Sequence, residues 1–140
     1  MSFVMRPMEG NEAFHTPVLR KEAYMSRLKD YMPMVYVASK FSQGDREENL
    51  EKTRRYCKFV IGKKGIAMAP HLMMPQFISE DDPAGRELAM RINMIFIDKC
   101  DSVWFFGELS PGMRMELDHA RFRQKDIHFF NEACEEVELT

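Results

Sequence analysis

The chain has 140 residues, the size of one ordinary globular domain. Hydrophobic residues make up 45% and charged residues 30%, so we expect a packed core rather than disorder along the whole chain. The formal net charge of -2 argues against nucleic acid as a partner, because proteins that bind phosphate backbones are usually basic. No apolar stretch approaches the ~18 residues of a membrane-spanning helix, and residues 1–10 lack the apolar segment of a secretory signal. We therefore expect a cytoplasmic protein without a membrane partner.

Cysteine use also indicates a reducing compartment. Cys57, Cys100 and Cys134 are widely spaced and include no Cys-x-x-Cys pair, whereas a disulfide framework or a structural zinc site needs a different pattern. Glu116 and His119 have the Glu-x-x-His spacing of carboxylate-bridged di-metal sites. Such sites draw a second motif and further glutamates from other helices, and the chain supplies neither. The sequence predicts no metal site and no cofactor.

One domain is predicted, with a segment before it and a short tail after it. Residues 1–32 are expected to form an N-terminal extension that is partly helical, because Thr16-Pro17 suits the start of a helix running to about Lys29. The domain itself is expected to span residues 33–131. Residues 132–140 are rich in glutamate and are predicted to be a solvated acidic tail.

From residue 34 onward, strand-like and helical patterns alternate. Four short β-prone runs predict strands at 34–38, 65–69, 101–107 and 127–130. Three segments with helix-start signals, such as Asp82-Pro83, predict helices at 45–61, 82–99 and 112–125, with a helical turn at 71–77. This alternation predicts an α/β fold: a doubly wound, mainly parallel, flavodoxin- or Rossmann-like sheet of four to five strands with flanking helices. The first helix is expected to bury a stripe made of Leu50, Thr53, Cys57, Val60 and Ile61.

Two loops of such a sheet are the expected ligand-binding loops. Ligands of doubly wound sheets bind at the carboxyl ends of the strands, which here means the loops after Ala38 and Phe106. After the second of these, Ser110 and Gly112 form a Ser-x-Gly turn that opens a helix. Free backbone N–H groups, a hydroxyl and the positive helix end suit an anion, and Gly112 lets a ligand approach the backbone closely. A simple capping turn with Ser110 as N-cap explains the same residues.

Glu116 adds an ionisable group beside this turn. Met113, Glu116, Leu117 and Ala120 share one helical face, which puts a carboxylate on the stripe that faces the sheet. Burial raises the pKa of a carboxyl and a helix N-terminus lowers it, and a nucleophile needs the ionised form. A partly exposed glutamate bonded to local backbone is the alternative. Spacing alone does not choose between the two.

Further polar residues occur at the expected ligand edge. The first loop carries Ser39, and the helix after it begins with Arg46; a hydroxyl and a guanidinium there suit a phosphate or a sugar hydroxyl, although an ordinary polar loop explains them nearly as well. Asn93 lies in a largely apolar helix and needs a partner if it is buried, either a ligand or a backbone carbonyl. His71 follows the second strand and can reach the same crevice, although an isolated histidine is more often structural or exposed.

Four segments together resemble the nucleoside 2-deoxyribosyltransferase superfamily. They occur in the family's order over residues 33–130, and they are closest to a branch of small bacterial and phage proteins that share Ala-Pro-His and Ser-x-Gly-x-x-x-Glu. The segments are Tyr36-Val37-Ala38-Ser39, Ala69-Pro70-His71, Cys100-Asp101-Ser102-Val103-Trp104 and Ser110-Pro111-Gly112-Met113-Arg114-Met115-Glu116.

The resemblance implies cleavage or exchange of the N-glycosidic bond of a small-molecule nucleoside or nucleotide. Glu116 matches the family's nucleophile, which attacks the anomeric carbon, releases the base and forms a glycosyl-enzyme ester that water or a second base resolves. Tyr36 matches the tyrosine that orients the glutamate. The resemblance also implies a homo-oligomer. The candidate substrate-binding residues are Ser39, Arg46, His71, Ser110, Gly112 and Met113.

One position departs from the family pattern. Transferases of the family usually carry an aspartate in the helix before the third strand, and Asn93 occupies the corresponding stretch here. We include Asn93 among the catalytic candidates, but an amide holds a hydroxyl without being able to donate a proton as an acid. Two functions follow: an N-glycosidase or deoxyribosyltransferase that uses Glu116, or a non-catalytic nucleotide-derivative binding protein on the same fold. A structural or assembly protein is a third, plainer interpretation.

Overall fold

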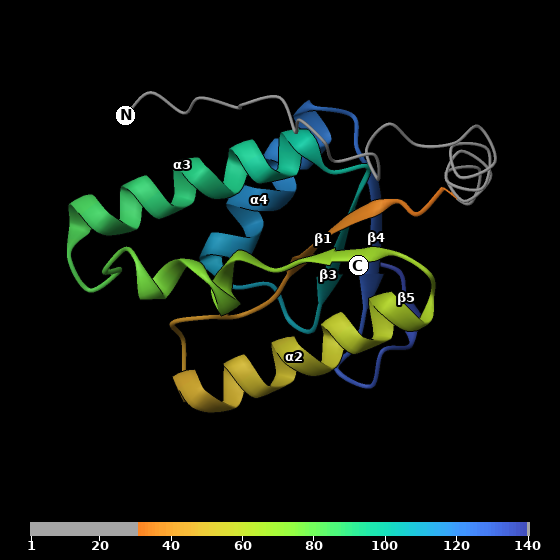
Figure 1. The fold of residues 1–140 in the computed structure, drawn as a ribbon, viewed down its shortest axis with the longest axis horizontal. Helices are drawn as coiled ribbons and strands as arrows, with labels where there is room; N and C mark the ends of the chain where they lie inside the picture. The colour runs from red at the N-terminus through yellow and green to blue at the C-terminus, as the bar shows by residue number, and fades with distance from the viewer. Residues whose placement is uncertain (1–30, 140) are drawn as a thin grey trace, which may run out of the picture. The chain divides into compact units, whose positions relative to one another are not determined.

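The computed structural model describes residues 31–139, which form an α/β fold around a five-stranded sheet (Figure 1). The strand order is β2-β1-β3-β4-β5; neighbouring strands from β2 to β4 are parallel, and β5 is antiparallel to β4. The predicted fold class is confirmed. The helix expected up to Lys29 lies outside the described residues. The strands are β1 (Met34–Ala38), β2 (Ile66–Met68), β3 (Ser102–Phe106), β4 (Asp126–Phe130) and β5 (Glu136–Val137).

Helices cover both faces of the sheet. In Figure 1, α2 (Arg46–Gly62) lies on one side of the strands, and α3 (Pro83–Lys99) and α4 (Pro111–Phe122) lie on the other. Two single-turn 3-10 helices, η1 (Pro70–Leu72) and η2 (Met74–Gln76), follow β2 in the place expected for a helical turn. Asp82 caps α3 as predicted, since its carboxylate accepts a hydrogen bond from the Ala84 N–H at 3.1 Å.

Strand β1 has helices on both of its faces, which explains its uninterrupted apolar sequence. Tyr36 and Ala38 belong to the core cluster on the side of α3 and α4, whereas Val35 and Val37 belong to the cluster on the side of α2. All four residues are fully buried. A strand covered on both faces cannot alternate polar and apolar residues without burying polar groups.

The buried stripe of α2 differs from the one expected from the sequence. The helix buries Asn49, Thr53, Tyr56 and Val60, and the predicted Ile61 is 60% exposed. Counting apolar residues missed Asn49, whose amide Nδ2 donates to the backbone carbonyls of Phe41 at 3.1 Å and Gln43 at 2.6 Å. These bonds satisfy a buried polar group and fix the loop that follows β1.

The acidic tail is not simply a solvated end. Its Glu136–Val137 segment forms β5, although both residues remain exposed. Asn131 folds the chain back, because its Oδ1 accepts from the Ala133 and Glu135 N–H groups at 3.0 and 2.9 Å. The sequence gives little sign of a two-residue strand among glutamates, since such a strand forms only when a neighbouring strand offers its edge.

In the part of the chain that the structure describes, no helix combines the length and the apolar character required to cross a bilayer.

Candidate functional site

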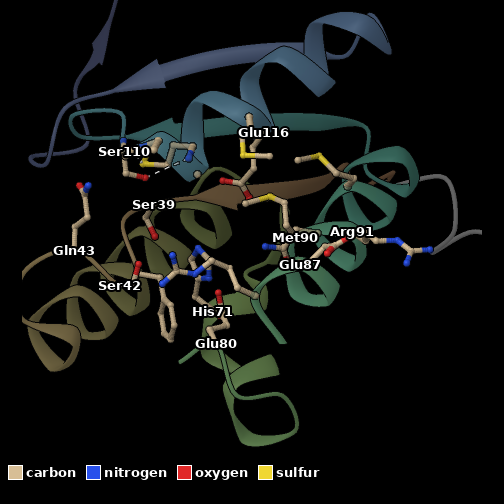
Figure 2. Close-up of a pocket in the computed structure, with 18 of the residues that line it drawn as sticks. Ser39, Ser42, Gln43, His71, Glu80, Glu87, Met90, Arg91, Ser110 and Glu116 are labelled. Carbon is tan, nitrogen blue, oxygen red and sulfur yellow. Dashed lines mark hydrogen bonds between the residues drawn. The ribbon is translucent and has the colours of Figure 1, made fainter. Parts of the chain in front are cut away.

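A cavity of about 980 Å³ opens at the carboxyl ends of β1 and β3 (Figure 2). These two strands mark the point where the strand order reverses, because β2 lies on one side of β1 and β3 on the other. Ser39 lines the cavity after β1, and Ser110 lines it after β3. Helix α3 and the loop before it complete the wall. Pockets of about 300–1,000 Å³ hold small organic ligands, so the cavity has room for one.

Glu116 of α4 lines the cavity. The residue is only 2% exposed, and its Oε2 accepts a hydrogen bond from the Tyr36 hydroxyl of β1. The pKa of Glu116 is raised to about 7. Burial is the main cause, the Glu80 carboxyl acts in the same direction, and the Tyr36 hydrogen bond opposes both. Burial and the neighbouring Glu116 raise the pKa of Tyr36 well above its usual value. Glu116 therefore changes its charge near neutral pH, while the tyrosine stays protonated and donates.

The Ser110 turn caps α4 and also lines the cavity. Ser110 Oγ accepts from the Met113 N–H at 3.2 Å, and the Ser110 carbonyl accepts from the Arg114 N–H at 2.9 Å. Pro111 has no N–H, so the Gly112 N–H is left for a ligand. The two interpretations of the turn are thus compatible, but the helix offers a single backbone donor and the Ser110 hydroxyl rather than a full anion cradle.

Gly112 has room for a Cβ without a clash. A Cβ built on it would lie 3.5 Å from Met90 Cε and 4.0 Å from Ser110 Oγ, which are ordinary contact distances. Both neighbours line the cavity, so the missing side chain leaves room there rather than relieving a clash within the protein. Met113 also lines the wall and is 1% exposed.

The first loop contributes Ser39 but not Arg46. Ser39 is buried, and its Oγ shares a hydrogen bond of 2.7 Å with Thr53 Oγ1. The Arg46 guanidinium instead forms an ion pair with Asp81 at 3.3 Å and lies 4.8 Å from the ring centroid of Phe41. The structure does not bring Arg46 to the cavity wall, because the acidic loop before α3 and the Phe41 ring hold its guanidinium.

His71 and Asn93 both lie on the wall. The His71 ring stacks on Phe41 with centroids 4.9 Å apart and an interplanar angle of 16°. Burial lowers the pKa of His71 to about 4, against the effect of a hydrogen bond to the Ser39 backbone, so the ring is neutral at physiological pH. Asn93 is 5% exposed and contributes to the cavity lining.

Sequence reasoning missed several residues of the wall. Phe41 belongs to the loop after β1, and the other missing residues come from the loop after β2 and the first turns of α3, a segment that reaches the same edge of the sheet. The helix start at Asp82 was predicted. The sequence did not predict that the segment before Asp82 forms part of the cavity wall, because that position depends on packing between residues far apart in the chain. The additional wall residues include Phe41, Glu80, Asp81, Arg86, Met90 and Arg91.

The cavity wall is more acidic than basic. Among the described residues that line it, the carboxyl groups belong to Glu80, Asp81, Glu87 and Glu116, and the guanidinium groups belong to Arg86 and Arg91. Of these carboxyl groups, that of Asp81 is paired with Arg46. This balance suits a neutral ligand, or one on which positive charge develops, at least as well as an anion.

The fold has a counterpart among solved structures. The chain is similar to a 2-deoxyribosyltransferase from the psychrotolerant bacterium Bacillus psychrosaccharolyticus, with a TM-score of 0.54 and 16% sequence identity over 75% of this chain and 77% of that one. The two proteins share an α/β architecture. No curated protein matches the chain in sequence. The model of the family described as a domain of unknown function (DUF7768) matches residues 33–130, and the chain belongs to that family.

Proposed function

We propose that the protein cleaves or exchanges the N-glycosidic bond of a nucleoside or nucleotide, with Glu116 as the nucleophile. One observation carries this proposal: a buried carboxyl, held by the Tyr36 hydroxyl, faces a cavity of about 980 Å³ beside the start of α4. The fold similarity to a 2-deoxyribosyltransferase supports it. The acidic wall supports it as well, because positive charge develops on the sugar as the bond to the base breaks.

In the proposed reaction, the ionised Glu116 attacks the anomeric carbon and the base leaves. The Tyr36 hydroxyl holds one carboxylate oxygen, so the other oxygen is the attacking one. We assign Ser110, the Gly112 N–H and Asn93, all on the cavity wall, to hold sugar hydroxyls, or a phosphate where the substrate has one. Water or a second base then attacks the same carbon, which frees Glu116 with net retention.

Base release from 2′-deoxyribonucleosides and ribonucleosides, each with and without a 5′-phosphate, tests this proposal. The wild type should release free base from at least one of them. Glu116→Gln keeps the size of the side chain but removes the nucleophile, so kcat should fall on the order of 10⁴-fold or more. A glycosyl adduct on Glu116, trapped with a 2-fluoro sugar analogue and detected by mass spectrometry, gives an independent readout. A wild type that releases no base from the whole panel contradicts the proposal.

A second function is favoured by Asn93. An amide on the wall can bind a hydroxyl but cannot supply a proton to a leaving base. If the wild type binds a nucleotide derivative without releasing base, and Glu116→Gln binds it equally well, the protein is a non-catalytic binding protein of that ligand.

We also propose, from the resemblance, that the protein forms a homo-oligomer in the cytoplasm, with a small molecule rather than nucleic acid as its ligand. Sedimentation analysis of the full chain tests the assembly, and a monomer at micromolar concentration contradicts it.

A further inference from the structure

The proposed reaction requires a group that the Asn93 position does not supply. A departing purine or pyrimidine is a poor leaving group unless a ring nitrogen or a carbonyl oxygen is protonated as the bond breaks. Asn93 has no acidic proton, and the Tyr36 hydroxyl is occupied by Glu116. His71 is neutral at physiological pH. An acid must therefore come from elsewhere on the wall.

Glu80 is a carboxyl on the opposite wall from Glu116. Figure 2 shows Glu116 entering from α4 and Glu80 from the loop on the other side of the cavity, and both line it. Each carboxyl is positioned by a different element, so a ligand between them can meet one at its sugar and the other at its base. Glu80 is half-buried, whereas the neighbouring Asp81 is exposed and paired with Arg46.

The environment of Glu80 raises the pKa of its carboxyl. Burial raises the pKa of Glu80, and Arg46 and Arg86 lower it, with the neighbouring Asp81 raising it again. Glu80 in turn raises the pKa of Glu116 and of Tyr36, so the two carboxyls interact electrostatically across the cavity. Two interacting carboxyls that share one proton can serve as an acid and a nucleophile in one active form. A base seated against Glu80 would remove water from it and strengthen this effect.

The loop that carries Glu80 is held in place by its neighbours. Gly85 in the first turn of α3 lets the Ser79 carbonyl approach, because a Cβ there would lie 1.8 Å from that oxygen. Asp82 caps the helix at 3.1 Å, and the Arg46–Asp81 pair ties the loop to the start of α2. The positions on both sides of Glu80 are thus fixed by backbone packing and by the Arg46–Asp81 ion pair.

On the basis of the proposed function, we propose that Glu80 is the general acid that protonates the leaving base and the general base that activates the incoming water. In the first step, the Glu80 proton passes to a base nitrogen, the bond between the anomeric carbon and the base breaks, and a Glu116 oxygen bonds to that carbon. In the second step, water bonds to the same carbon and gives its proton to Glu80, while the ester bond to Glu116 breaks. Both carboxyls return to their starting forms.

A pair of substrates that differ only in their need for an acid tests this role. 2′-Deoxyguanosine needs protonation, whereas 7-methyl-2′-deoxyguanosine already carries a positive charge on its base; the 5′-monophosphates replace both where the wild type requires the phosphate. Glu80→Gln should lower kcat/KM for the first substrate by about 10²–10³-fold and for the methylated one by less than about 5-fold, because kcat/KM reports base release and not the later attack of water. The kcat/KM of wild type should show an alkaline decline with 2′-deoxyguanosine but not with the methylated substrate, whose base needs no proton from Glu80.

The control is Glu87→Gln, which removes another carboxyl of the same wall and should leave the ratio of the two rates within about 3-fold of wild type. Equal slowing of both substrates by Glu80→Gln overturns the role of Glu80 while leaving Glu116 as nucleophile. A wild type inactive on both substrates refutes the proposed function itself, so the two failures are distinguishable. Circular dichroism and thermal unfolding confirm that each variant is folded before its rates are compared.

Discussion

The starts of α2 and α4 occupy equivalent places after β1 and β3, but only the start of α4 opens onto the cavity. At α2, the Asp45 carboxylate accepts from the Glu47 and Glu48 N–H groups at 3.0 and 3.2 Å, and both of these residues are acidic. At α4, the cap is the neutral Ser110, and the first turn carries no acidic residue. A helix N-terminus whose partial positive charge is already neutralised by carboxylates attracts an anionic ligand only weakly. A position after a parallel strand therefore does not make a binding site unless the cap leaves the helix end available.

The largest difference between the starts of α2 and α4 is expected to come from the charge of Glu116, a residue of α4. Because its pKa rises from 4.5 to about 7, the folded protein holds a proton that the unfolded chain releases. The stability of wild type relative to Glu116→Gln should therefore decline as pH rises from about 4.5 to 7, by roughly 3 kcal/mol in total, and stay constant above that range. Urea unfolding of both proteins from pH 4.5 to 8.5 measures the decline.

Tyr36→Phe tests whether the Tyr36 hydroxyl sets the pH range of this decline. The Tyr36 hydrogen bond lowers the pKa of Glu116, so removing the hydroxyl should move the decline to higher pH. A stability difference between wild type and Glu116→Gln that does not vary with pH would show that the Glu116 carboxyl is not buried with a raised pKa.

The next effect concerns the space at Gly112. Gly112→Ala places a methyl group in the cavity without a clash inside the protein, so ligand affinity should fall by about 10-fold, or ~1.4 kcal/mol. Unfolding stability should stay the same or rise, because alanine favours helix over glycine by about 1 kcal/mol. Isothermal titration with the ligand found in the release assay measures the affinity, and thermal unfolding measures the stability.

Gly62→Ala is the control, since a Cβ there meets nothing within 4 Å and Gly62 does not line the cavity. If both glycine variants bind the ligand as tightly as wild type, the ligand does not approach the start of α4.

The smallest effect compares the two caps directly. Asp45→Ala and Ser110→Ala should each lower stability by about 1 kcal/mol through loss of an N-cap. Only Ser110→Ala should also weaken ligand binding, because only Ser110 lines the main cavity. Chemical unfolding and titration on the same samples test both statements, and equal binding losses from the two variants would contradict the contrast between the helix ends.

Much of the fold could be predicted because its signals are local. The run at Met34–Ala38, the capping residues Asp45, Asp82 and Ser110, and the alternation of strands and helices each depend on neighbours in the chain. The short strand β5 could not be predicted in the same way, because its two exposed residues pair only after β4 is in place.

The candidate site was predictable in part for the same reason. Helical spacing puts Glu116 on the face toward the sheet, and the strand pattern puts Tyr36 within β1. The Arg46 prediction depended on the charge of one loop alone, whereas the partner that holds Arg46, Asp81, is 35 residues away. The cavity wall around Glu80 and Phe41 had no local pattern.

The sequence by itself determined the order and type of the main elements and the face on which Glu116 lies, because hydrophobic periodicity and capping act over a few residues. Only the tertiary structure decided that Tyr36 meets Glu116, that Arg46 turns to Asp81, and that Glu80 stands across the cavity from the nucleophile candidate. Those pairings join residues 35 or more positions apart. Contacts at such separation depend on how whole strands and helices pack, and burial then sets the ionisation of the groups that they enclose.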